Sequence, residues 1–290
     1  MTDQRPAASP APGKVRALAL SCHPVPTLAV TAISAGLAAL AGLSLGRAAL
    51  LVAAVFAGQL SIGWSNDAID AARDRATARA DKPVASGAVS PRTVGVAAGV
   101  ALVLAVVLSL ALGLPPGLAA LTVVACGWAY NLGLKATVAS FVPYAIAFGI
   151  LPAVATLSAP DPAWPAPWAM VMGGLFGVSA HLANVLPDLD DDVDNGVRGL
   201  PHRIGARATA VACPILLAVA CLVVLFGPSW GAGGEIAGWR WVAAGALVLL
   251  AGAGVALAVR RPAGRALFGV VIVTALIAVV LFAVSGQALT

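Results

Sequence analysis

Charged side chains are scarce in this chain of 290 residues, where Asp, Glu, Lys and Arg together make up 10% of the sequence. Soluble domains carry about 25% charged residues. Aromatic residues are also few, at 6%, whereas hydrophobic residues reach 60%. So little charge excludes an ordinary soluble enzyme and predicts an integral membrane protein.

Cysteine is sparse as well, and its pattern excludes two classes of small domain. The spacing of the four cysteines matches neither a zinc site nor a disulfide framework. Each lies in or beside an apolar run, which favours a role as a small buried side chain. They are Cys22, Cys126, Cys213 and Cys221.

Long apolar runs recur along the sequence, and each can cross about 30 Å of hydrocarbon as a helix. Because the runs are continuous rather than alternating, they predict helices and not a barrel. We expect an all-α membrane protein with nine transmembrane helices in one domain, residues 18–290, after a disordered cytosolic tail, residues 1–17. The predicted spans are 24–44, 48–68, 93–112, 116–134, 138–157, 167–187, 208–227, 239–259 and 266–286.

The basic residues are distributed unequally over the loops between these spans. With the N-terminus in the cytosol, 15 of the 17 lysines and arginines lie on the cytosolic side, and only Arg47 and Arg240 lie outside. This bias is typical of membrane proteins and predicts a cytosolic N-terminus in the plasma (inner) membrane of a prokaryote, surrounded by lipid. It also explains the net charge of +5 without a nucleic-acid partner.

Nine of the 12 acidic residues are concentrated in two stretches, each at the cytosolic end of a span. At 100° per residue, each stretch forms a row in which an asparagine is followed by carboxylates one and two helical turns later. Two facing helices would aim these carboxylates at one volume. The first row is Asn66, Asp70 and Asp74 with Asp67 beside it, and the second is Asn184, Asp188 and Asp192 with Asp191 beside it.

Carboxylates held this closely would repel one another and raise each other's pKa values. Mg²⁺ resolves the conflict, because one or two carboxylates hold it while water and substrate phosphate complete its coordination. The rows therefore predict metal clusters that bind a phosphorylated ligand. Two solvated acidic helix ends are a disfavoured alternative, since the rows share a register and ionisable groups at membrane depth are usually functional.

Basic residues on the same side could contact phosphate oxygens, Arg in a bidentate manner and Lys as a point charge. The candidates, some of which could make this contact, are Arg73, Arg75, Lys82, Lys135, Arg198 and Arg203. For Lys82, Lys135 and Arg198, simple anchoring at the cytosolic face is an equally good interpretation. His181 lies one turn before Asn184 and is expected to face the same cavity. There it either binds the acceptor, takes up a proton or only stabilises the bundle.

The two motifs resemble those of the UbiA superfamily of intramembrane prenyltransferases. The similarity rests on Asn66-Asp67-x-x-Asp70-x-x-x-Asp74 and on Asp188-x-Asp190-Asp191-Asp192-x-x-x-Gly196-x-Arg198. The run Lys82-Pro83-Val84-Ala85-Ser86-Gly87 is similar to the family's Arg-Pro-Leu-x-x-Gly segment, with Lys in place of Arg. Tyr130 and Lys135 resemble the family's Tyr and Lys between the two motifs.

The resemblance implies an enzyme that uses Mg²⁺ to ionise a polyprenyl diphosphate and transfers the prenyl group to a small, often aromatic or quinone-precursor, acceptor. The donor chain would lie in a tunnel between helices, under a cap formed by the loops after the second and sixth spans. Metal-linked residues would be Asp67, Asp70, Asp74, Asp188, Asp191 and Asp192. Asn66 and Asn184 would ligate or orient, Lys82, Lys135 and Arg198 would contact diphosphate, and Tyr130 would face the cation or only pack.

Two alternatives to prenyl transfer to an acceptor remain. A terpene cyclase on the same scaffold would use the same metal motifs and trap the cation within its own chain. A divalent-cation transporter is disfavoured because both acidic rows lie on one side, whereas a transport path needs polar groups toward the far face.

Overall fold

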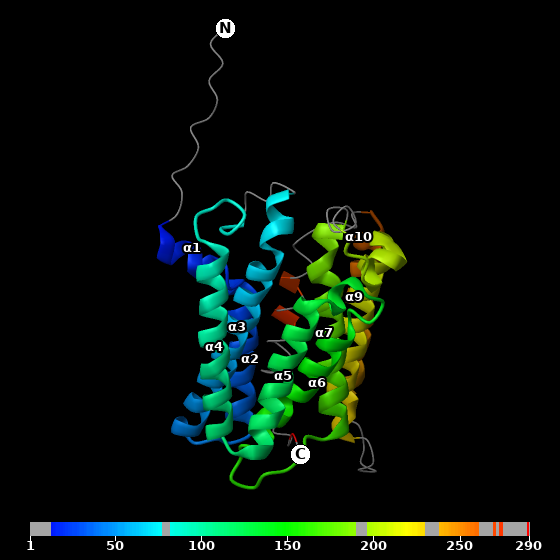
Figure 1. Cartoon of the computed structure of the whole chain (residues 1–290). Coiled ribbons are helices and arrows are strands. Elements are labelled where there is room, and N and C mark those ends of the chain that lie inside the picture. The colour runs from blue at the N-terminus through cyan, green and yellow to red at the C-terminus, as the bar shows by residue number, and fades with distance from the viewer. Residues whose placement is uncertain are drawn as a thin grey trace.

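A computed structural model of the chain describes residues 13–76, 82–189, 196–229, 238–260, 269–270, 273–274 and 289. Over these residues all regular structure is helical, and the long helices stand side by side as a bundle (Figure 1). The helices are α1 (Lys14–Leu20), α2 (Pro24–Leu40), α3 (Leu45–Ala76), α4 (Pro91–Ala111), α5 (Leu114–Leu132), α6 (Val142–Thr156), α7 (Pro167–Val185), α9 (Leu200–Phe226) and α10 (Gly238–Arg260). Three 3₁₀ turns join them: η1 (Leu134–Ala136), η2 (Leu186–Asp188) and η3 (Gly227–Ser229).

The predicted spans can be compared with these helices. Each of the first eight predicted runs carries a helix, and almost all of the ninth, 266–286, lies outside the described residues. By length and apolar composition, five described helices can cross a membrane, or six if α1 and α2, bent by 60°, form one span. The all-α membrane fold is therefore confirmed, whereas the count of nine spans is not.

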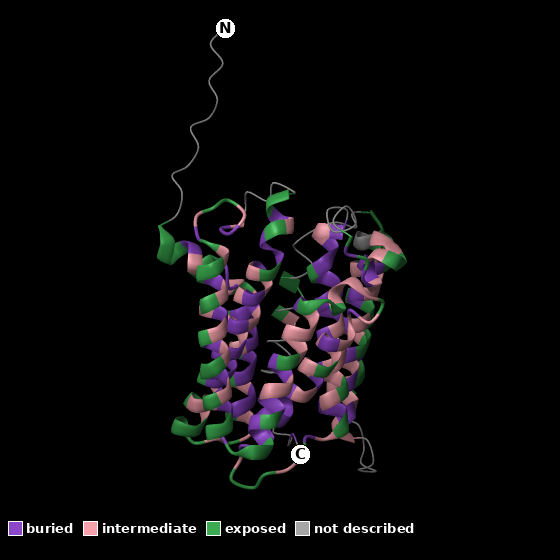
Figure 2. Cartoon of the chain, in the orientation of Figure 1, coloured by how far each residue is buried: buried purple, intermediate pink, exposed green. Residues whose placement is uncertain are grey.

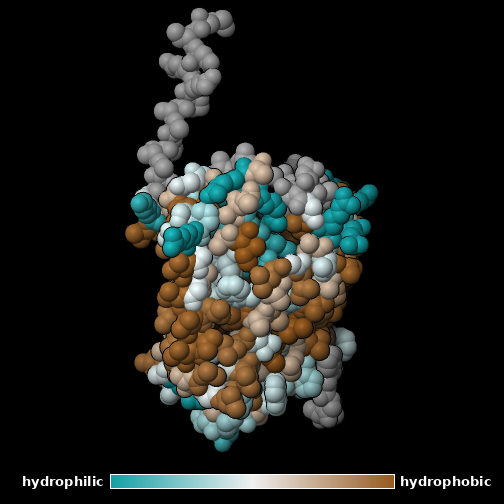
Figure 3. Space-filling model, viewed as in Figure 1, coloured by the Kyte–Doolittle hydropathy of each residue, from teal (hydrophilic) through white to brown (hydrophobic). Residues whose placement is uncertain are grey.

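The surface of the bundle agrees with a membrane protein. Side chains of α4 such as Val96, Val103 and Val107 point outward and are more than half exposed. Figure 2 shows exposed residues along the outer faces of the helices, and Figure 3 shows apolar residues forming a belt below a polar end of the molecule. A belt of exposed apolar side chains is stable in lipid and costly in water.

The helix ends follow local rules of the sequence. Proline occupies the first turn of α2, α4, α5, α6, α7 and α9, where no intrahelical hydrogen bond needs its missing N–H. Ser90 caps α4 by accepting a hydrogen bond from the Thr93 N–H, at 3.0 Å. Gly133 ends α5 with a φ of 155°, which L-residues rarely adopt, and turns the chain into η1.

The helix α1 begins at Lys14, inside the segment 1–17 that the sequence predicts as a tail. The cause is tertiary, because Ala17 is fully buried in a cluster with Ala71 of α3 and with Val84 and Val89 of the loop between α3 and α4. The described part of that loop therefore packs on the end of α3 through Val84 and Val89.

Glycines let the helices around the site approach closely. A Cβ on Gly173 of α7 would lie 2.3 Å from the Phe148 carbonyl oxygen of α6, and one on Gly177 would lie 2.3 Å from that of Tyr144. On α3, a Cβ at Gly63 would lie 2.2 Å from the Cys22 carbonyl oxygen at the α1–α2 bend. In a membrane the hydrophobic effect does not drive helices together, since lipid is as apolar as the helix surfaces. Small residues instead allow the close van der Waals contacts that hold the helices together.

We expect Gly177→Ala to lower the melting temperature of the detergent-solubilised protein, because overpacking of a tight contact costs about 1–3 kcal/mol. Gly99→Ala on α4 is the matched control, since a Cβ there meets nothing within 4 Å, and Ala is favoured over Gly in helices by about 1 kcal/mol. Thermal unfolding of both variants tests the contact, and equal melting temperatures would contradict it.

Candidate active site

The first acidic row lies on one continuous helix, as predicted. The helix α3 runs from Leu45 to Ala76, so Asp67, Asp70 and Asp74 fall on one face near its end. All three are buried, with exposures of 2%, 5% and 5%. Buried carboxylates are costly unless they are paired, and basic side chains from four segments meet them.

Asp67 and Asp74 share one lysine. Lys82, in the loop after α3, places its Nζ 2.9 Å from Asp74 Oδ2 and 3.5 Å from Asp67 Oδ1. On the opposite side, His23 Nε2 lies 3.0 Å from the same Asp67 oxygen. The structure thus places Lys82 beside the carboxylates of the first row. A role in the site was one of the two interpretations that the sequence allowed for Lys82, and anchoring at the cytosolic face was the other.

Asp70 is held from two sides. Lys135, on η1, donates to both of its oxygens, at 2.5 Å and 2.6 Å. Arg73, one turn along α3, places Nη2 2.7 Å from Asp70 Oδ2. Lys135 and Arg73 therefore reach the row from different elements, separated by more than 60 residues along the chain.

The two lysines differ in their protonation behaviour. Burial disfavours the ammonium of Lys82, but Asp67 and Asp74 outweigh this effect, so the pKa of Lys82 is raised. Burial also disfavours the ammonium of Lys135, and Asp70 compensates only in part because neighbouring cations repel it, so the pKa of Lys135 is lowered. Lys82 consequently stays charged at physiological pH, and Lys135 is the more readily neutralised of the two.

His23 is a site residue that the sequence analysis did not select. It precedes α2 in a left-handed conformation, with φ 54°, and is the one described non-glycine residue with positive φ. Gly63 permits the close contact with the Cys22 carbonyl that carries His23 to Asp67, one turn further along α3. The available signal was its position directly before Pro24, which begins a span at the end that holds both acidic rows.

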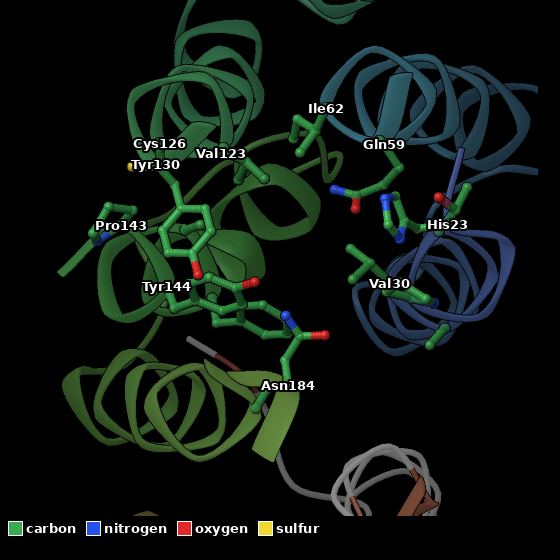
Figure 4. Close-up of a pocket in the computed structure, with 18 of the residues that line it drawn as sticks. His23, Val30, Gln59, Ile62, Val123, Cys126, Tyr130, Pro143, Tyr144 and Asn184 are labelled. Carbon is green, nitrogen blue, oxygen red and sulfur yellow. The ribbon is translucent and has the colours of Figure 1, made fainter. Parts of the chain in front are cut away.

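A cavity of about 190 Å³ opens beside the row and is lined by α2, α3, α5, α6 and α7. Polar side chains stand at intervals along apolar walls, and Figure 4 shows His23, Gln59, Tyr130, Tyr144 and Asn184 around one space. Gln59 and Tyr144 belong to no motif in the sequence, so the sequence analysis did not select them as site residues. His23 and Asn66 line the cavity next to the acidic row, and the walls beyond them are mostly apolar. Such a cavity suits a ligand with a charged head and a hydrocarbon chain.

His181 is fully buried beside this cavity rather than among its lining residues. Its ring centroid lies 5.6 Å from that of Tyr130 and 5.0 Å from that of Tyr144. Its Nε2 lies 3.0 Å from Ser140 Oγ, which also accepts the Leu200 N–H at 3.0 Å. His181 therefore supports the two tyrosines from behind, and a direct contact with substrate stays a prediction.

A network of amides joins α3 to α5 beneath the row. Asn66 Nδ2 donates to Asn131 Oδ1 at 3.1 Å. Asn131 Nδ2 in turn donates to the Ile62 carbonyl and to Ser65 Oγ, each at 2.9 Å. Asn66 and Asn131 both line the cavity, and Asn131 is 4% exposed.

The second acidic stretch departs from the expected α-helical row. The helix α7 ends at Val185, and the chain continues as the 3₁₀ turn η2, with Pro187 in its first turn. A 3₁₀ turn has three residues per turn rather than 3.6, so Asp188 does not continue the α-helical register of Asn184. Asp190, Asp191, Asp192 and Asp194 lie outside the described residues.

Beyond this stretch, Arg198 is exposed and its carbonyl accepts a hydrogen bond from Arg203 Nε at 3.1 Å. Gly199 packs closely on the Lys135 carbonyl, where a Cβ would lie 2.6 Å from the oxygen. The chain that follows the second stretch thus packs on the segment that carries Lys135.

The residues present fit Mg²⁺. Three buried carboxylates and the amide of Asn66 are hard oxygen donors, which this ion prefers. In the described part of the chain no three His, Cys, Asp or Glu side chains converge on one point. The reason is that basic groups pair with each carboxylate of the first row, while most of the second stretch lies outside that part.

Comparisons with known proteins identify the family and the fold of this chain. A sequence profile of the UbiA prenyltransferase family matches residues 27–271. Among solved structures, a UbiA homologue from Archaeoglobus fulgidus bound to GPP and Mg²⁺ has a TM-score of 0.71 and 17% identity, covering 93% of this chain and 98% of that one. An apo UbiA homologue from Aeropyrum pernix K1 has a TM-score of 0.69 and 19% identity, covering 89% and 97%.

A digeranylgeranylglyceryl phosphate synthase also has this fold, with a TM-score of 0.62, 15% identity and coverage of 94% of this chain and 99% of that one. At such low identities these likenesses establish the fold. A search of curated protein sequences finds no significant match.

We expect Lys135→Met to destabilise the metal-free protein by about 1–3 kcal/mol, because it removes a hydrogen-bonding partner from the buried Asp70. Thermal unfolding in detergent with EDTA measures the effect, and Arg75→Met, exposed at the same end of α3, is the control. Adding Asp70→Asn should restore part of the loss. If Lys135→Met and Arg75→Met have the same melting temperature, the ion pair does not stabilise the fold.

Proposed function

Because this chain belongs to the UbiA prenyltransferase family, we propose that it transfers a prenyl group from a polyprenyl diphosphate to a small acceptor within the membrane. The observation that carries the proposal is the buried row of Asp67, Asp70 and Asp74 next to an apolar cavity that His23 and Asn66 line. Relatives of the same fold bind GPP or DMAPP together with Mg²⁺, which supports this donor class.

We assign the metal-holding role to Asp67, Asp70 and Asp74 of the first row and to Asp188, Asp191 and Asp192 of the second stretch. Mg²⁺, when bound there, neutralises the diphosphate and so makes it a better leaving group. Asn66 and Asn184, which face the cavity from α3 and α7, orient or ligate beside the carboxylates.

In the proposed complex, the basic residues contact the diphosphate as well as the carboxylates with which they now pair. Lys82, Lys135 and Arg73 already lie within 3 Å of carboxylate oxygens, so phosphate oxygens beside those carboxylates fall within their reach. Arg198 joins them from the loop after the second stretch. Charge-assisted contacts of this kind are strong and stabilise negative charge as it develops on the leaving group.

The reaction breaks the allylic C–O bond, and its electron pair leaves with the diphosphate. A new bond forms between the allylic carbon and the acceptor, which then loses a proton. The apolar cavity excludes water from the cation, and the ring of Tyr130 offers a π face to it. His181, held by Ser140 and packed on Tyr130, positions that ring and assists acceptor binding.

The topology of the proposal follows from the charge distribution of the loops. We place the N-terminus and the mouth of the cavity on the cytosolic side of the plasma (inner) membrane of a prokaryote, where most lysines and arginines fall. A water-soluble diphosphate head would then enter from the cytosol, and the prenyl chain would lie among the helices in the membrane.

The decisive experiment is a reaction in nanodiscs with Mg²⁺ and geranyl, farnesyl or geranylgeranyl diphosphate, with and without a pool of aromatic and quinone-precursor acceptors. We expect mass spectrometry to detect one prenyl unit added to an acceptor. If hydrocarbon or terpene alcohol formed equally well without an acceptor, the protein would be a terpene cyclase and not a transferase.

Asp70→Ala and Asp188→Ala should each abolish turnover while the protein stays folded in detergent, because each removes a carboxylate assigned to metal. Asp161→Ala, an exposed carboxylate in the loop between α6 and α7, is the control and should keep wild-type activity. Excess EDTA should stop the reaction and added Mg²⁺ should restore it. Near-wild-type turnover by either site variant, or activity that persists in EDTA, would contradict the metal assignment.

A further inference from the structure

The orientation of the Asn66 side chain is determined by its neighbour on α5. The amide of Asn131 contacts a backbone carbonyl, that of Ile62, at 2.9 Å. A carbonyl oxygen can only accept, so the NH₂ group of Asn131 must point toward it. The second Nδ2 hydrogen of Asn131 is donated to Ser65 Oγ, whose own hydroxyl donates to the same Ile62 carbonyl.

The oxygen of Asn131 must therefore point the other way, toward Asn66. An oxygen facing Asn66 accepts only from its NH₂ group, and Asn66 Nδ2 indeed donates to it at 3.1 Å. Because an amide is planar, the oxygen of Asn66 then points away from Asn131, and Asn66 is one of the residues that line the cavity. The Ile62 carbonyl thus sets the orientation of the Asn131 amide, and the Asn131 amide in turn sets that of Asn66.

This orientation has a chemical consequence at the mouth of the cavity. A carbonyl oxygen is a ligand for a hard cation, whereas an NH₂ group in the same place would repel it. Asn66 lies one residue before Asp67 and one helical turn before Asp70, so a cation held by these carboxylates would lie close to the Asn66 side chain.

We propose that Asn131 is a positioning residue for the metal site: it holds Asn66 with its oxygen toward the divalent cation. The inference rests on the proposed function, since it concerns the same cation. Outer groups that orient a metal ligand commonly affect metal affinity by tenfold to a hundredfold when they are replaced. Asn131 itself needs no contact with the cation to exert this effect.

The test is binding of Mn²⁺ alone to the full-length protein in detergent, measured as the loss of the free-ion signal in electron paramagnetic resonance. We expect Asn131→Leu and Asn131→Ala to weaken Mn²⁺ binding by about tenfold or more. Asn66→Ala should weaken it as well, and Asn66→Ala with Asn131→Leu should bind no worse than Asn66→Ala, because Asn131 acts only through Asn66.

Ser61→Ala is the matched control. Ser61 is fully buried on α3 and accepts a hydrogen bond from Trp128 Nε1 of α5, at 2.9 Å, so it also joins these two helices without touching Asn66. This variant should keep wild-type Mn²⁺ affinity, which separates amide orientation from general damage to the helix interface.

Each outcome is decisive. Wild-type affinity in the Asn131 variants, or an equal further loss in the Asn66→Ala background, would overturn the positioning role alone. Failure of both Asn131 variants to fold, while Ser61→Ala folds, would make Asn131 a structural residue and overturn it too. A wild-type protein without a saturable Mn²⁺ site would overturn the metal site of the proposed function, and this inference with it.

Discussion

Three carboxylates buried at the end of one membrane helix impose the main constraint on this structure. An isolated buried charge is too costly to keep, so each carboxylate of α3 needs a cation close by. The partners come from the bend before α2, from α3 itself, from the loop after α3 and from η1. They are His23, Arg73, Lys82 and Lys135. These segments are therefore held to α3 by polar contacts, next to the cavity that His23 and Asn66 line.

The constraint extends from the first acidic stretch to the second through the segment after α5. Lys135 holds Asp70, and five residues later Ser140 bonds both His181 of α7 and the Leu200 N–H at the start of α9. Gly199 makes room for this contact, because any side chain there would collide with the Lys135 carbonyl. The segment that carries Lys135 and Ser140 therefore contacts both the first acidic row and the chain that follows the second stretch.

The cavity depends on a second requirement, which is close approach of the helices that enclose it. Gly173 and Gly177 bring α7 against α6, and Gly63 brings the α1–α2 bend against α3. In lipid, packing and hydrogen bonds must replace the hydrophobic effect between helices. The amides of Asn66 and Asn131 meet this need between α3 and α5, and Asn66 directly precedes the first carboxylate of the row, Asp67.

The sequence by itself determined the membrane class, the approximate positions of eight helices and the first acidic row on α3, because apolar runs, prolines and an i, i+4 pattern are local signals. It could not predict that His23, Gln59, Asn131 and Tyr144 border the same cavity, nor which base pairs with which carboxylate. Those contacts join segments as far apart as Asp70 and Lys135. Only the tertiary structure decided them, because the energy of burying a charge depends on which distant group reaches it, and no short stretch of sequence contains that information.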